Sequence, residues 1–166
     1  YSRLLPVPIV RQATPYSCGN ASLLAVLYYW NAMNEGELAL HAPLDTVPEF
    51  GTHPQSMLRY AKSLGLQATL KTQVSLDEVE DAIDRKEPVI VDYQAWGSEI
   101  EKIDYSSVWD SGHYSVVIGY DKTSRCAFAE VVCLRSYVSK TVINCAAVTR
   151  RHGAASWLWI ASRLSI

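Results

Sequence analysis

The order of its local patterns constrains the fold of this chain more than any other feature of the sequence. Apolar residues at helical spacing come first, from Cys18 to about Trp30, with no interrupting proline. β-branched runs typical of buried strands come later, from Val89 to Tyr93 and from His113 to Tyr120. This order predicts an α+β fold, in which a helical lobe packs on a mainly antiparallel sheet.

Turn and cap signals divide the region between these segments. A second helix is predicted from about Gln55 to Leu64, because Gly65 suits the C′ position after a helix. Leu66 to Thr72 alternates like a short strand, and Ser75 to Glu78 is a capping-box pattern that opens a third helix to about Arg85. The prolines in residues 3–10 predict an extended arm, and residues 41–54 and 96–111 are predicted loops.

Length and composition exclude several classes of protein. The 166 residues fit one domain, residues 1–166, and 49% hydrophobic with 19% charged residues is typical of a globular chain rather than a disordered one. The formal net charge of -2 gives no global field that would attract nucleic acid, so no nucleic-acid partner is expected. The longest apolar stretch, Leu23 to Trp30, is shorter than the roughly 20 residues that cross a bilayer.

Charge divides the chain after Asp121. Residues 1–121 carry a net charge of -8, whereas residues 122–166 carry +6 and three of the four cysteines. One interpretation is a basic interaction surface. The basic residues are scattered rather than clustered, however, so a divergent C-terminal segment is the preferred interpretation.

Cys18 is the first candidate for chemistry. Pro15 breaks the chain just before it, and Ser17 is a plausible N-cap, which would put Cys18 in the first turn of a helix. A helix N-terminus offers partial positive charge and N–H donors that lower a thiol pKa, and only the thiolate attacks. Gly19 would let a substrate carbonyl approach the backbone closely. Taken alone, a cysteine is more often a small buried apolar residue.

His113 and Gln12 extend this candidate site. His113 follows Gly112 at the head of an apolar strand, and a neutral imidazole can take the thiol proton and later give it to a leaving amine. Gln12 lies six residues before Cys18, and its amide could donate to a developing oxyanion. The other histidines are interpreted as surface residues: His41, His53 and His152.

Two segments, in this order, resemble the C39 peptidase family. Gln12 to Leu24 (QATPYSCGNASLL) is similar to the family's signature around the nucleophile, and Gly112 to Asp121 (GHYSVVIGYD) resembles its histidine strand. Pro88 to Asp92 is similar to the strand before it, so the resemblance covers about residues 7–121. By residue match it implies that Cys18 is the nucleophile, His113 the base and Gln12 the oxyanion donor.

The resemblance also implies a fold, an activity and partners. The family has a papain-like fold, and its best-known members are peptidase domains of bacteriocin-exporting ABC transporters, which cleave leader peptides after a Gly-Gly pair. It therefore implies a cysteine endopeptidase that acts on a peptide or protein, needs no cofactor, and lies in the cytoplasm, with a membrane transporter as an expected partner. No P-loop occurs in this sequence, so a transporter ATPase would be on another chain or another part of the gene product.

The third member of a catalytic triad departs from the family pattern. The family places an Asp, usually followed by Pro, about sixteen residues after the histidine, and here that position is Ala129, followed by Glu130. Glu130 could orient the imidazole if the hairpin has one extra residue, and Asp121 is the other candidate. A third alternative is that the tail is not native to the family, for example through a reading-frame change.

Two alternatives to peptide hydrolysis stay open. The absent Asp-Pro allows a C39-like module that binds a peptide or partner without cutting it. The same thiol chemistry could also transfer an acyl group to an amine rather than to water. A Cys3His zinc site is disfavoured, because its spacings lack the short knuckles of such sites; it would comprise Cys126, Cys133, Cys145 and His152.

Overall fold

The computed structural model describes residues 3–72, 74–94, 112–122, 126–130, 140–143 and 156–163, with side chains for 3–72, 74–92 and 112–122. The helical elements are α1 (Cys18–Tyr29), the 3-10 helix η1 (Glu37–Leu40), α2 (Pro54–Ser63) and α3 (Leu76–Asp84). The strands are β1 (Arg3–Leu4), β2 (Leu66–Thr72), β3 (Val89–Gln94), β4 (Gly112–Asp121), β5 (Cys126–Glu130), β6 (Lys140–Ile143) and β7 (Ser156–Arg163).

The helices begin and end where local chemistry requires. The predicted capping box opens α3: the Ser75 hydroxyl accepts from the Glu78 N–H at 3.2 Å, and the Glu78 carboxylate accepts from the Ser75 N–H at 2.9 Å. Gly65 follows α2 with φ +76°, the left-handed conformation that favours glycine after a helix. α1 is buried along most of its length, because its sequence is apolar on every side.

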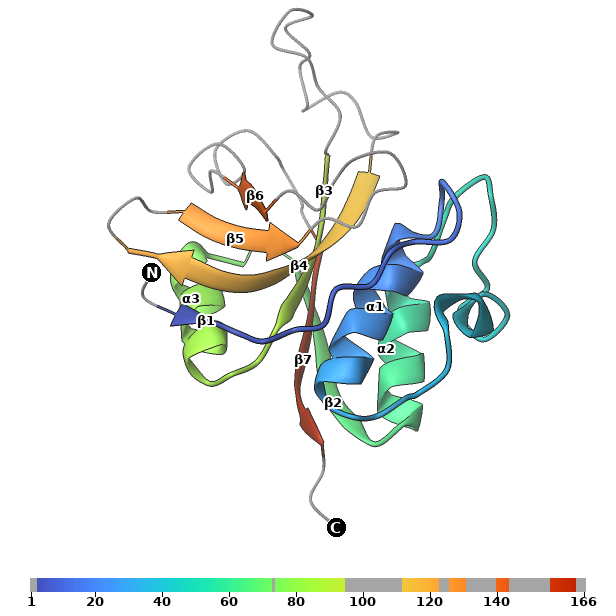
Figure 1. Ribbon diagram of the computed structural model, residues 1–166, viewed down its shortest axis with the longest axis horizontal. Helices are drawn as coiled ribbons and strands as arrows, with labels where there is room; N and C mark the ends of the chain where they lie inside the picture. Colours follow the sequence, from blue (N-terminus) through green and yellow to red (C-terminus); the bar gives the residue numbers. More distant parts are fainter. Residues whose placement is uncertain are drawn as a thin grey trace, which may run out of the picture.

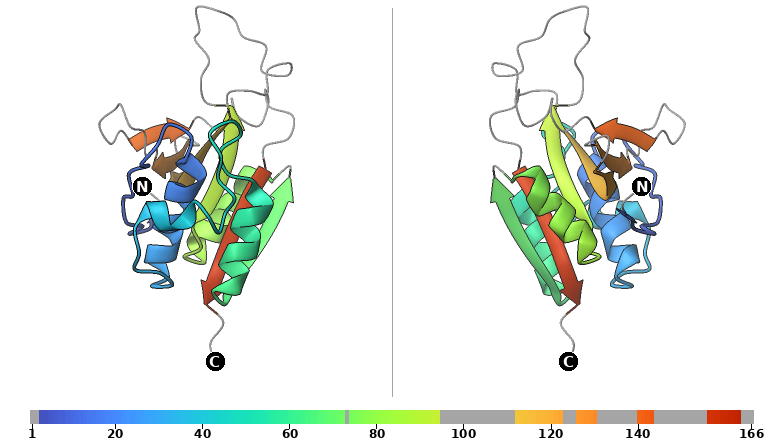
Figure 2. Two further views of the ribbon diagram at one scale, coloured as in Figure 1. Left: turned by 90° about the vertical axis from the view of Figure 1, so that its right-hand side faces the viewer. Right: turned by 90° about the vertical axis from the view of Figure 1, so that its left-hand side faces the viewer.

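Within the described residues the sheet has seven strands, and their order in the sheet differs from their order in the sequence. It runs β2-β7-β3-β4-β5-β6, and β1 also pairs with β4; all these pairs are antiparallel. Figure 2 shows β7, near the end of the chain, lying between β2 and β3. The last described strand therefore completes the sheet between two strands from the first hundred residues.

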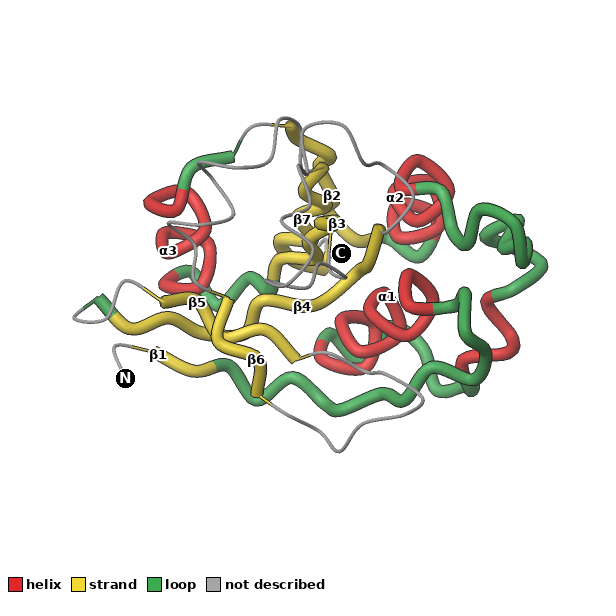
Figure 3. Tube along the Cα trace, turned by 90° about the horizontal axis from the view of Figure 1, so that it is seen from above, coloured by secondary structure: helices red, strands yellow, loops and turns green. Residues whose placement is uncertain are grey.

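The helices cover both sides of this sheet. α1 and α2 lie beside each other on one side, whereas α3 lies on the other, as the views in Figures 1 and 3 agree. α1 packs against β4, and α2 packs against β2 and β7. The predicted α+β architecture, with a helical part on an antiparallel sheet, is confirmed. The predicted helices and strands of the first half lie within a few residues of their expected bounds.

The N-terminal arm is only partly a strand. Arg3 and Leu4 pair with Tyr120 and Gly119, and the arm then runs past β4 towards α1 (Figure 1). A Cβ added at Gly119 would lie 2.6 Å from the Arg3 carbonyl oxygen, so only glycine permits this close pairing. The predicted loop at 96–111 lies outside the described residues. Within the described chain, no helix has the length and apolar character needed to cross a membrane.

Candidate active site

Cys18 is the first residue of α1, and the residue is partly exposed. Ser17 occupies the N-cap position as predicted, but its hydroxyl makes no cap hydrogen bond and instead bonds Thr14. The Cys18 sulfur accepts backbone N–H groups of Tyr114 and Gly19. Burial nevertheless raises the pKa of the Cys18 thiol, and these N–H donors offset only part of that effect. The expectation of a lowered thiol pKa at the helix start is therefore wrong for the resting protein.

His113 is the second residue of β4, opposite Tyr93 of β3. Its side chain is 4% exposed, and burial lowers its pKa to about 4. The imidazole is thus neutral at pH 7, the form that can accept a proton. Because the Cys18 sulfur accepts the N–H of Tyr114, the start of α1 lies beside the β4 residue that follows His113.

Sequence reasoning missed a second buried pair beside Cys18. Asp92 of β3 lies opposite Tyr114 of β4, and the Tyr114 hydroxyl donates to the Asp92 carboxylate. Burial raises the pKa of Asp92 to about 6, and the hydrogen bond from Tyr114 moderates this rise. The ionised carboxylate in turn raises the pKa of the Cys18 thiol. Only the register between β3 and β4 creates this pair, and no sequence pattern encodes that register locally.

Gly19 has a packing role that its position beside the thiol did not suggest. A Cβ at Gly19 would lie 2.8 Å from the Cβ of Thr52 and 3.2 Å from a ring carbon of Tyr114. Glycine therefore lets the start of α1 approach both β4 and the loop at 46–52. Asn20 fastens that loop, because its Oδ1 accepts from the hydroxyls of Thr46 at 2.7 Å and Thr52 at 2.6 Å.

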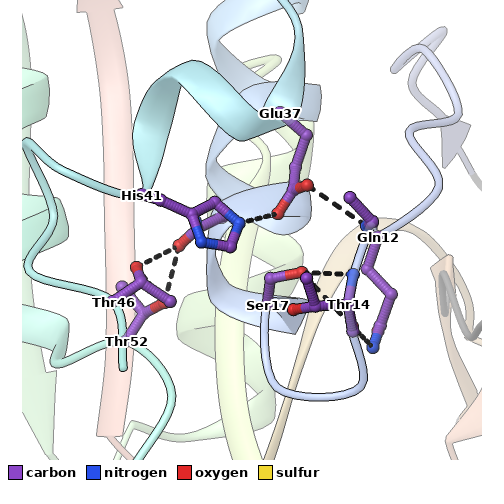
Figure 4. Close-up of polar contacts among 9 residues, drawn as sticks. Gln12, Thr14, Ser17, Glu37, His41, Thr46 and Thr52 are labelled. Carbon is purple, nitrogen blue, oxygen red and sulfur yellow. Dashed lines mark hydrogen bonds and ion pairs between the residues drawn. The ribbon is translucent and has the colours of Figure 1, made fainter. Parts of the chain in front are cut away.

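Gln12 is buried, with 5% of the residue exposed. Its Nε2 donates to the Thr14 carbonyl oxygen at 2.7 Å, as Figure 4 shows. A glutamine amide carries two N–H donors, so this bond fixes the side chain while the second N–H stays chemically able to serve an oxyanion. The role of Gln12 in the reaction remains a prediction.

The register narrows the choice of a third triad member. Asp121 ends β4 eight residues from His113, and a strand separates such positions by about 25 Å. Asp121 therefore does not orient this imidazole. Ala129 pairs with Val117, which shares a face of β4 with His113, and Glu130 pairs with Val116. The Glu130 side chain lies outside the described ones, so its orienting role stays a prediction.

Three residues of the disfavoured zinc site lie outside the described residues: Cys133, Cys145 and His152. Within residues whose side chains are described, no three His, Cys, Asp or Glu side chains gather at a site for a metal ion.

The pKa shifts of Asp92 and His113 predict opposing effects of pH on the stability of the fold. Folded His113 binds fewer protons than unfolded His113 between about pH 4 and 6.5, so its contribution is lost as the pH falls through that window. Folded Asp92 binds more protons than the unfolded group between pH 3.8 and about 6, so its contribution is lost as the pH rises through that window. The two effects nearly cancel near pH 5.

We expect Asp92→Asn to reveal the pH dependence of stability that His113 causes, because it removes the opposing contribution of Asp92. Between pH 6 and pH 4, its free energy of unfolding should fall by up to about 3 kcal/mol relative to the parent protein. His113→Asn should change in the opposite direction by a similar amount. Urea denaturation at half-unit pH steps measures both slopes. Parallel curves for parent and Asp92→Asn would contradict the raised Asp92 pKa.

Comparison with known proteins adds a family and a fold. A family model described as the Peptidase_C39 like family matches residues 4–158, which includes much of the basic tail. A search of curated proteins finds no match.

Solved structures share the fold at low sequence identity. A C39-like peptidase structure from Bacillus anthracis has 16% identity and a TM-score of 0.68, covering 98% of this chain and 99% of that one. The peptidase domain of Streptococcus ComA, a bifunctional ABC transporter involved in quorum sensing, has 20% identity and a TM-score of 0.66, covering 98% and 100%. A double glycine motif protease from an AMS/PCAT transporter, solved with its leader peptide, has 17% identity and a TM-score of 0.64, covering 96% and 95%.

Proposed function

This chain belongs to the Peptidase_C39 like family, and we propose on that premise that it is a cysteine peptidase with Cys18 as nucleophile and His113 as base. The observation that carries the proposal is the placement of a partly exposed cysteine at the start of α1, where its sulfur accepts the N–H of the residue after His113. The proposed reaction also requires the His113 imidazole to lie within hydrogen-bond reach of this sulfur, because the proton must move as the sulfur attacks.

The proposed reaction begins from a neutral pair. Burial keeps the Cys18 thiol protonated and the His113 imidazole neutral at pH 7. His113 takes the thiol proton as the sulfur attacks the peptide carbonyl carbon, so the thiolate forms only during the attack. The Gln12 amide and the Cys18 N–H donate to the oxyanion of the tetrahedral intermediate.

Collapse of that intermediate breaks the C–N bond. His113 gives its proton to the leaving amine and becomes neutral again, while the acyl group stays on the Cys18 sulfur as a thioester. Water then attacks the thioester, with His113 taking its proton. The second collapse breaks the C–S bond and releases the acid, and His113 returns the proton to the sulfur, which restores the thiol and the neutral imidazole. Glu130 stays the candidate orienter of the imidazole. Its partner Val116 lies on the opposite face of β4 from His113, so this role requires the Glu130 side chain to turn around the end of the strand pair.

Leader peptides are the proposed substrate class, and a transporter the proposed partner at the cytoplasmic face of a membrane. Two of the similar structures come from ABC or AMS/PCAT transporters, and one of these was solved with a leader peptide. The resemblance around Cys18 supports the same substrate, a peptide cut after a Gly-Gly pair.

A synthetic peptide with one central Gly-Gly pair tests this substrate. We expect a single cleavage after the second glycine, identified by mass spectrometry of both products. The matched control peptide carries Leu-Leu at the same place and should stay intact, because large side chains hinder close approach of the backbone to the site. Equal cleavage of both peptides would contradict the leader-type specificity, and no cleavage of either would contradict the peptidase proposal.

A peptide-binding module without turnover is the second candidate. The register supports it, since Ala129 rather than a carboxylate pairs with the β4 position that shares a face with His113. Without a group that orients the imidazole, the enzyme would lose much of its rate of peptide cleavage. Binding of the Gly-Gly peptide without any product over a day would favour this candidate.

A further inference from the structure

Glu37, the first residue of η1, carries a buried carboxylate that sequence reasoning did not single out. Its side chain is only 5% exposed. One carboxylate oxygen, Oε2, accepts the backbone N–H of Ala13 at 3.2 Å, and the other, Oε1, lies 3.3 Å from Nε2 of His41. Figure 4 shows the carboxylate between His41 and the segment that carries Gln12. Since a buried carboxylate is stable only with partners, these two contacts fix its position.

Glu37 contacts the segment of residues 12–17. Hydrogen bonds between Thr14 and two other residues of this segment hold it in a compact turn. The Thr14 carbonyl oxygen accepts from Gln12 Nε2 at 2.7 Å and from the Ser17 hydroxyl at 3.3 Å. The Thr14 N–H in turn donates to the Ser17 hydroxyl at 3.1 Å. Thr14 therefore links Gln12 to Ser17, the residue immediately before Cys18. Gln12 and Cys18 are thus connected through one hydrogen-bonded segment.

The region of η1 contacts residues 12–17 at a second point. His41 follows η1, and its ring meets the Tyr16 ring edge-on, with centroids 6.0 Å apart. His41, which was predicted to be a surface residue, has a side chain that is 21% exposed and paired with Glu37, so it is only partly at the surface. Glu37 and His41 therefore anchor the segment at Ala13 and at Tyr16, from a region more than twenty residues further along the chain.

We propose that Glu37 is a positioning residue for peptide cleavage: by holding the Ala13 N–H, it keeps the Gln12 amide aimed at the oxyanion that forms beside Cys18. This inference rests on the proposed function, because it needs Gln12 as an oxyanion donor. Without the Glu37 carboxylate, the Ala13 peptide loses its partner and Gln12 is held only by its own segment. A displacement of about 1 Å at such a donor can cost a factor of 100 in rate.

A double-mutant cycle tests the proposal. Glu37→Ala should lower kcat by about 10- to 100-fold with KM within about twofold, because oxyanion donors act in the transition state. In a Gln12→Ala background, adding Glu37→Ala should change kcat by less than about twofold, because the group that Glu37 positions is already gone. Equal effects of Glu37→Ala in the two backgrounds, or an unchanged kcat in the single variant, would overturn the proposal.

Two further variants separate positioning from general stability. Glu37→Gln should restore kcat to within about threefold of the parent, since its carbonyl oxygen still accepts from Ala13 and its amide can donate to His41. Glu78→Ala is the matched control: it removes a glutamate from the capping box of α3 and should lower the melting temperature without lowering kcat. A Glu37→Gln variant as slow as Glu37→Ala would contradict an acceptor role.

If Glu37→Ala does not fold, a backbone variant tests the positioning role of Glu37 instead. Ligation at Cys18 allows residues 1–17 to be made by synthesis, with an ester in place of the Ala13 amide. This change removes the N–H that Glu37 accepts and alters no side chain, and we expect the same loss of kcat as in Glu37→Ala. A parental kcat in the ester variant would overturn the proposal.

The double-mutant cycle also distinguishes failure of the positioning role of Glu37 from failure of the oxyanion role of Gln12. If Gln12→Ala keeps the parental kcat, the oxyanion role of Gln12 fails and the positioning role fails with it. If Gln12→Ala is slow and both Glu37→Ala and the ester variant are not, only the positioning role fails.

Discussion

Cys18→Ala is expected to abolish cleavage of the Gly-Gly peptide, with a loss in kcat of at least about 10⁴-fold, because it removes the proposed nucleophile that forms the thioester. Cys18 is a partly exposed residue at the start of α1, so replacing its thiol group by hydrogen should leave the helix and its packing in place. Product formation followed by mass spectrometry measures the loss. Under turnover conditions, the parent should also yield a covalent acyl adduct on Cys18, which acid quenching traps.

Ser22→Ala is the matched control for this variant. Ser22 lies one turn further along α1, and its replacement removes a single buried oxygen from the same helix. We expect parental kcat in Ser22→Ala and no acyl adduct in Cys18→Ala. Cleavage that persists in Cys18→Ala would rule out Cys18 as the nucleophile, whatever the fold.

His113→Ala is expected to lower kcat by about 10³-fold and to change the shape of the pH profile. In the parent, kcat/KM should fall as the pH drops through about 4, because a protonated His113 cannot accept the thiol proton. In His113→Ala, attack requires prior ionisation of Cys18, whose pKa is raised by burial. The residual rate should therefore keep rising into the alkaline range. Initial rates from pH 3.5 to 10 measure both profiles.

The exposed histidine at the start of α2 provides the control for this variant. His53→Ala changes an exposed side chain and should keep both the parental kcat and the parental acid limit near pH 4. An acid limit that stays near pH 4 in His113→Ala would assign it to another group. Alkylation of Cys18 by iodoacetamide at a rate that stays constant from pH 7 down to pH 5 would instead indicate a thiolate–imidazolium pair at rest, because only the thiolate is alkylated.

The sequence was a reliable guide wherever structure depends on neighbours along the chain. The capping box at Ser75, the glycine after α2 and the β-branched run of β3 each act within a few residues, so their elements lie close to the predicted bounds. Local signals also placed Cys18 at a helix start and His113 at a strand start. Their resemblance to one family, in the same order, gave the fold that the comparisons confirm.

The sequence could not provide the contacts between distant segments. The register of β3 against β4 puts Asp92 opposite Tyr114, and a slip of one residue would put Tyr93 there instead. Glu37 meets the Ala13 N–H across a stretch that has no periodic pattern. The insertion of β7 between β2 and β3 likewise follows from pairing across most of the chain.

The same division applies to the chemistry of the candidate site. The residue types at positions 18 and 113, a thiol and an imidazole, were evident from the sequence, and they define which reaction is chemically available. Their charge states were decided only by the fold. Burial raises the pKa of Cys18 and lowers that of His113, because both lie where the chain excludes water, and solvation depends on all the surrounding segments at once.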